Sequence, residues 1–223
     1  SKSIAGPFVT HHDAYHNLQE VPINPRLHQQ PGQSVWVTVM SPDSAAWCAE
    51  RGWKMCTAWS PMPVVEALAS RYWEAGEAAG RPVNSSMLGL RRRVFVADSD
   101  EEAREKYEAA TDVIGALAGR GFETRDPRIL EFMMQPDDFV IGSPETVAEQ
   151  LIEQCRAGGF GVVMAFPDFA LFSPEDLARS HELLGTRVGP ILHSADVARP
   201  SQAREGGARK WSPWEGHAAS SRP

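Results

Sequence analysis

Apolar positions in the middle of the chain follow two alternating patterns. Short β-branched and aromatic runs predict strands, and each precedes a longer stretch with apolar residues at helical spacing. The predicted strands cover residues 35–39, 54–58, 87–97 and 161–166. The predicted helices cover residues 41–51, 62–79, 98–119, 143–157 and 173–192. Strands that alternate with helices imply a parallel sheet with crossover helices, so the fold class is α/β.

Three of the predicted helices begin with the same chemistry. A Ser-Pro-acid tripeptide starts at Ser41, Ser143 and Ser173. The serine hydroxyl accepts a backbone N–H as N-cap, and proline fits the first turn because its missing N–H is not needed there. The acid lies near the positive end of the helix dipole. These tripeptides fix where the three helices begin.

The two ends of the chain lack this periodicity. Residues 1–34 are rich in Pro, His, Asn and Gln, and we expect an extended crossing segment. Residues 195–223 are rich in Ala, Ser, Pro and Gly, and we expect a disordered tail.

The body between the two ends, residues 35–194, contains four predicted strand–helix units, whereas a (β/α)8 barrel has eight in about 250 residues. Four parallel strands cannot close a barrel, and they leave two unpaired edges.

Composition narrows the function classes. The chain carries 22 Lys+Arg against 29 Asp+Glu, a net charge of -7, which disfavours a nucleic-acid partner. Its apolar stretches are too short to span a bilayer, and no signal peptide is visible at the start. The three cysteines, Cys48, Cys56 and Cys155, are odd in number and widely spaced, which indicates reduced thiols rather than a disulfide scaffold. We therefore expect a cytoplasmic protein without a membrane partner.

Four segments, by their order and spacing, resemble the luciferase-like flavin-dependent monooxygenases, the family of bacterial luciferase. They are residues 25–31 (PRLHQQP), 35–52 (VWVTVMSPDSAAWCAERG), 139–151 (FVIGSPETVAEQL) and 159–192, with GVVMAFPDF followed by a helix ending in VGPIL. The family fold is a (β/α)8 TIM barrel. The resemblance implies that residues 35–194 are the C-terminal half of such a barrel, since its first four strand–helix units have no counterpart here.

The resemblance also implies a chemistry. Enzymes of this family use reduced flavin and O2 to oxygenate an organic substrate, and some relatives transfer hydride to a deazaflavin instead. The implied cofactor is FMN, with a flavin reductase as electron source and a homo-oligomer or a complementing half-barrel as assembly. The family's better-known catalytic histidine lies in the upstream half, so no catalytic residue is assigned. The rival hypothesis is a non-catalytic half-barrel, either an assembly partner or a fragment.

Ser41 and Ser44 are the candidate phosphate-binding residues. They follow the first predicted strand and open a helix, where free N–H groups and the helix dipole favour an anion. In a parallel barrel this is the active-site face. In the family that the chain resembles, these positions hold the FMN phosphate; the alternative is an ordinary N-cap, as at Ser143 and Ser173. Trp59, after the next strand, is expected either to flank the flavin or to be a plain core residue.

Four residues near the N-terminus, His11, His12, Asp13 and His16, could suggest a metal ion. Ligands at such short spacing share an ion when a regular element holds them, but the flanking prolines indicate a loop. The sequence therefore predicts no metal site here. A solvated or substrate-facing loop is the favoured interpretation, with proton handling near the flavin as the alternative.

Two further segments have more than one interpretation. Arg91, Arg92 and Arg93 lie in a predicted strand, so that Arg92 faces opposite to its neighbours. We expect a solvated strand end or salt bridges to nearby helices, with phosphate or partner binding as the alternative.

Residues 121–138 match the family's insertion and form either a lid over an apolar substrate or a fixed surface excursion. Neither Gly-x-Ser-x-Gly nor Gly-x-Gly-x-x-Gly occurs, which disfavours an α/β-hydrolase and a dinucleotide-binding fold.

Overall fold

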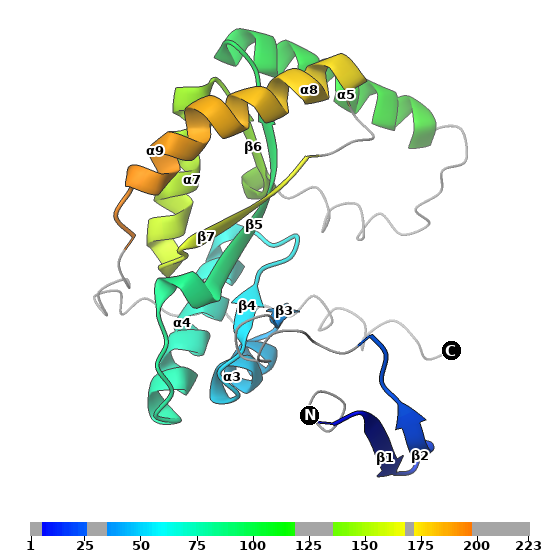
Figure 1. Cartoon of the computed structure of the whole chain (residues 1–223). Coiled ribbons are helices and arrows are strands. Elements are labelled where there is room, and N and C mark those ends of the chain that lie inside the picture. The colour runs from blue at the N-terminus through cyan, green and yellow to red at the C-terminus, as the bar shows by residue number, and fades with distance from the viewer. Residues whose placement is uncertain (1–5, 26–34, 119–135, 168–171, 198–223) are drawn as a thin grey trace, which may run out of the picture.

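The computed structural model describes residues 6–25, 35–118, 136–167 and 172–197 (Figure 1). The strands of these ranges are β1 (Phe8–His12), β2 (Asn17–Pro22), β3 (Trp36–Thr38), β4 (Lys54–Cys56), β5 (Leu88–Val96), β6 (Phe139–Gly142) and β7 (Val162–Phe166). The helices are α3 (Pro42–Glu50), α4 (Met62–Ala78), α5 (Asp100–Ala118), α7 (Pro144–Gly158), α8 (Pro174–Leu183) and α9 (Gly189–Ser194), with the shorter turns η1 (Ser85–Met87), η2 (Pro136–Asp138) and η3 (Leu184–Val188).

A five-stranded parallel sheet organises the body of the chain, as the alternation of strands and helices predicted. The long strand β5 lies at its centre and pairs with three others (Figure 1). The first part of β5 pairs with β4, and its last part, from Arg93 to Val96, pairs with β6. β7 pairs with β5 from Gly89 to Arg93. Among the described strands, β3 pairs with β4 alone and β7 with β5 alone, so the sheet is open and not a closed barrel.

One face of the sheet is covered by helices. Apolar residues of β3, β4 and the first half of β5 pack against α3 and α4, with Tyr72 and Leu68 among the buried side chains. The second half of β5 and β6 pack against α7, α8 and η3, with Val140 and Leu151 fully buried. This burial of about thirty apolar side chains is the main source of stability for the fold.

The opposite face of the sheet is open only in part, because Phe95 and Ile141 on this face pack with Ala103 of α5. Arg91 pairs in register with Met164, and Arg93 with Phe166, whose side chain is 45% exposed. At Gly89 a methyl group would lie 2.9 Å from both Met164 Cε and Trp36 Cζ3, so the missing side chain lets these two residues approach each other across the strand. In a closed (β/α)8 barrel, the face opposite the helices lines the interior.

Three strands were not among the predictions. β6 is a four-residue run, Phe-Val-Ile-Gly, directly before the Ser143 helix start. Residues 8–22, within the predicted extended segment, form an antiparallel hairpin of β1 and β2 that lies apart from the sheet (Figure 1). Asp13 forms its turn, because its carboxylate accepts the backbone N–H groups of Tyr15 and His16 at 2.8 and 2.6 Å.

The predicted helix of residues 173–192 is interrupted. α8 passes into the wider π-helical turn η3 and then α9. Pro190 lacks the N–H that would donate to the Thr186 carbonyl. In the same turn the Thr186 hydroxyl donates to the Glu182 carbonyl at 2.6 Å. The helix therefore continues with one widened turn.

All three cysteines are buried free thiols. Burial raises the pKa of Cys48 and of Cys155 to about 12, so neither is a reactive thiolate near neutral pH. None of the described helices combines the length and the apolar character that crossing a bilayer requires.

Candidate functional site

Ser41 and Ser44 lie where β3 turns into α3. Ser41 is the N-cap, and its hydroxyl oxygen accepts the backbone N–H of Ser44 at 3.3 Å. The two hydroxyls are 2.9 Å apart, and both side chains are partly exposed. Asp43, also in this first turn, is exposed. The carboxyl end of the strand therefore presents two hydroxyl groups at the positive end of a helix.

The other two Ser-Pro-acid starts differ from this one in an important respect. At α7, the carboxylate of Asp100 accepts the backbone N–H of Ser143 at 2.6 Å and the hydroxyl of Thr146 at 3.0 Å. At α8, the Ser173 hydroxyl donates to the carboxylate of Asp176 at 2.8 Å. Each of these helix starts thus holds an anionic group of the protein itself.

No carboxylate in the described ranges makes a hydrogen bond to Ser41 or Ser44. In the described ranges the start of α3 therefore differs from the starts of α7 and α8, which hydrogen-bond to a carboxylate of the protein.

Trp59 lies in the loop after β4, at the same end of the sheet. Its side chain is partly exposed, and the Arg91 guanidinium lies over its ring, 5.0 Å from the centroid. The indole Nε1 is buried, and no described residue accepts its proton. No hydrogen bond within the described ranges joins Trp59 to either serine.

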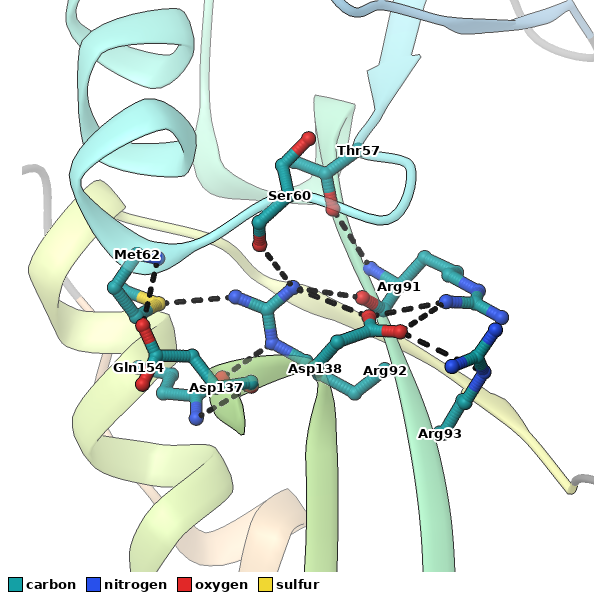
Figure 2. Close-up of polar contacts among 9 residues, drawn as sticks. All are labelled: Thr57, Ser60, Met62, Arg91, Arg92, Arg93, Asp137, Asp138 and Gln154. Atoms are coloured by element: carbon teal, nitrogen blue, oxygen red, sulfur yellow. Dashed lines mark hydrogen bonds and ion pairs between the residues drawn. The ribbon is translucent and has the colours of Figure 1, made fainter. Parts of the chain in front are cut away.

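Beside Trp59, the three arginines of β5 surround one carboxylate. Arg91 donates to both oxygens of Asp138 at 3.0 and 2.7 Å. Arg92 and Arg93 approach the same carboxylate at 3.7 Å. Figure 2 shows Arg91 and Arg93 on one side of the strand and Arg92 on the other, with Asp138 between them. The alternation predicted for these arginines is confirmed.

Of the two interpretations favoured for these arginines, the solvated strand end is wrong, and ion pairs with the neighbouring helical turn η2 are observed. Arg92 is fully buried and donates to the Arg91 carbonyl at 3.0 Å, to the side-chain oxygen of Gln154 and to the sulfur of Met62. Burial lowers the pKa of Arg92 and raises that of Asp138, and the opposite charges act against both shifts. The cluster is therefore a buried ionic network in the middle of β5, next to the start of β6.

Two other candidate segments remain, the predicted lid and the N-terminal histidine cluster. Most of the predicted lid, residues 121–138, lies outside the described residues, apart from η2, which supplies Asp138. Of the N-terminal cluster, His11, Asp13 and His16 come together at the hairpin turn, whereas His12 does not join them. The sequence contained no local signal that Asp138 pairs with the arginines, because 47 positions separate it from Arg91.

Comparison with known proteins decides the family. A family model of luciferase-like monooxygenases matches residues 3–160. The chain belongs to the luciferase-like monooxygenase family. This luciferase-like chain is 24% identical over 173 residues to 2,5-diketocamphane 1,2-monooxygenase 2 of Pseudomonas putida, a match that covers 68% of this chain and 47% of that enzyme.

Solved structures show the same fold for this luciferase-like chain. Monooxygenase RslO1 from Streptomyces bottropensis has a TM-score of 0.66 at 20% identity, covering 85% of this chain and 57% of RslO1. The oxygenating constituent of 3,6-diketocamphane monooxygenase from Pseudomonas putida, a type II Baeyer-Villiger monooxygenase in complex with FMN, has a TM-score of 0.59 at 22% identity, covering 86% and 56%. The chain thus spans about half the length of these relatives.

Proposed function

We propose that this chain is the C-terminal half of a flavin-dependent monooxygenase, and that the start of α3 binds the flavin phosphate. The observation that carries the proposal is the contrast among the three serine-capped helices. α7 and α8 hold carboxylates of the protein, and no described carboxylate hydrogen-bonds to Ser41 or Ser44. Membership of the family supports a flavin-type cofactor, with FMN favoured over a deazaflavin by the FMN-bound relative.

The residues at this edge fit such a ligand. Ser41 and Ser44 offer two hydroxyls, and the first turn of α3 adds the helix dipole, which together suit a phosphate monoester. Asp43 opposes an anion, so we expect binding of moderate strength. When bound, reduced flavin would supply the electrons that let O2 oxygenate an organic substrate.

Trp59 would lie beside the flavin rather than in the protein core. Its partly exposed ring already packs against Arg91, and its buried Nε1 is oriented where no described acceptor lies. An apolar, rigid ring at this place would exclude water from the flavin.

A fluorescence titration tests the proposal. Oxidised FMN is added to the whole chain, and the loss of flavin fluorescence is followed. We expect saturable quenching at micromolar FMN that a Ser41→Ala/Ser44→Ala double variant weakens. Ser173→Ala is the matched control, because it removes a serine cap of the same type whose hydroxyl already bonds to Asp176. Quenching that is absent, or equal in all three proteins, would reject the phosphate site.

A second candidate function, a half-barrel that acts as an assembly partner, is favoured by the open side of the sheet. Phe166 is 45% exposed on that face, and β3 and β7 each have one strand neighbour in the described ranges. Analytical ultracentrifugation with and without FMN separates the candidates. An assembled species that does not bind FMN would support the partner role, and FMN binding would support the enzyme role.

A further inference from the structure

A second cluster of ligand-type side chains lies on the hairpin, apart from the flavin site. His11 is in β1, Asp13 is in the turn, and His16 directly precedes β2. The Nε2 atom of His11 is 2.8 Å from Oδ2 of Asp13, and Nδ1 of His16 is 3.1 and 3.3 Å from the two carboxylate oxygens. Two imidazoles from the two sides of the turn therefore meet at one carboxylate.

These separations suit a common metal ion. Zinc bonds of about 2.0–2.2 Å to nitrogen and oxygen place neighbouring ligand atoms of a tetrahedral site about 3.3 Å apart. The ligand atoms of His11, Asp13 and His16 all lie within 4.8 Å of one another. Because these side chains are partly or fully exposed, rotations of the side chains can bring the three ligand atoms onto one ion.

The turn holds the carboxylate in place before any ion binds. Asp13 accepts the backbone N–H groups of Tyr15 and His16, so its position is set by the main chain. These bonds, together with the one from His11, lower the pKa of Asp13 to about 2, and the carboxylate is charged throughout the neutral range. A fixed anionic oxygen between two imidazoles is the donor set that first-row divalent metals such as Zn²⁺ prefer.

The hairpin register explains why His12 is excluded. His12 pairs with Asn17, whereas His11 pairs with Leu18, and successive side chains of a strand point to opposite faces. His12 is exposed and belongs to the same strand, yet it lies outside the cluster. The chain thus contains its own matched control for the site.

We propose that His11, Asp13 and His16 bind a divalent first-row transition metal, with Zn²⁺ as the representative ion, and that this ion links the two strands of the hairpin. Three protein ligands leave at least one coordination position to water. The ion binds the folded hairpin, so its binding energy adds to the stability of this element. The site is independent of the proposed flavin function, since none of its residues contributes to the start of α3.

Calorimetry on the whole, chelator-treated chain tests the proposal with ZnCl₂. We expect one Zn²⁺ per chain, and no comparable heat with MgCl₂, because Mg²⁺ prefers oxygen ligands. Mutating a residue that only hydrogen-bonds to a metal ligand typically lowers metal affinity about 10–100-fold. Since His11 and His16 would bind the ion directly, His11→Gln and His16→Gln should each lower the Zn²⁺ affinity at least about tenfold. His12→Gln should leave the affinity unchanged. Equal affinity in His11→Gln and His12→Gln would overturn the proposal.

Two further measurements guard against loss of binding through an altered hairpin. Asp13→Asn keeps a side-chain oxygen for the N–H groups of Tyr15 and His16 but removes the charged ligand, and it should also weaken Zn²⁺ binding. In the unaltered protein, NMR spectra of the imidazole rings should shift for His11 and His16 on addition of Zn²⁺, with His12 unmoved. Saturation with Zn²⁺ that leaves the His11 and His16 signals in place would reject the site.

Discussion

Asp138 lies fully buried among the guanidinium groups of three consecutive arginines. A buried ion pair contributes little net stability, but removing one partner leaves a buried charge without compensation. Asp138→Asn should therefore lower the free energy of unfolding by about 3–5 kcal/mol, as measured by urea denaturation. Asp43→Asn, at an exposed carboxylate, should change it by less than about 1 kcal/mol. Similar effects of the two variants would contradict the ionic network.

At the same scale, the sequence predicted which faces the arginines occupy but not their burial. Alternation along a strand is a local rule, and it placed Arg92 opposite Arg91 and Arg93. Burial depends on Asp138, Gln154 and Met62, which come from three other elements. For the same reason the structure, and not the sequence, showed which serine caps already hold a carboxylate.

At the scale of elements, Asp100 joins two helices. It lies in the first turn of α5, and its carboxylate accepts the Ser143 N–H at the start of α7, which lowers its pKa. A carboxyl with a lowered pKa stabilises the fold above the pKa of the unfolded chain, near 3.9, and the effect is lost as the pH falls through the folded value. Asp100→Ala should thus lower the unfolding midpoint at pH 7, and less so in acid.

Glu101→Ala is the control for this prediction, because Glu101 is the next residue of the same first turn and is exposed. Thermal unfolding followed by circular dichroism at neutral and acidic pH measures both variants. A destabilisation by Asp100→Ala that persists unchanged below the folded pKa would show that the carboxylate charge is not responsible.

Element boundaries followed the sequence wherever the signal was local. The Ser-Pro-acid starts gave α3, α7 and α8, since a cap depends on neighbouring residues. β6 was missed because four residues are too few to show a period, and the hairpin because its turn depends on the Asp13 side chain rather than on Gly or Pro. The sequence did not predict the widened turn after α8. Pro190 cannot donate a backbone hydrogen bond to residue 186, which lies one turn earlier in this widened turn.

At the scale of the whole molecule, the sheet combines a helix-covered face with a more open face, as expected for half of a barrel whose interior side is incomplete. The candidate serines and Trp59 follow the carboxyl ends of β3 and β4, the edge where barrel enzymes place their sites, whereas the arginine network lies in the middle of β5. The family was predictable from short motifs with the right order, and the structural relatives share the fold over more than four fifths of the chain.

The most direct test of the central claim compares FMN with riboflavin, which lacks the phosphate, in the unaltered chain and in Ser41→Ala/Ser44→Ala. If the start of α3 holds the phosphate, the unaltered chain binds FMN more tightly than riboflavin, and the double variant loses this preference while its riboflavin affinity stays the same. Fluorescence titrations give all four dissociation constants. A preference for FMN that survives in the double variant, or no preference in the unaltered chain, would contradict the claim.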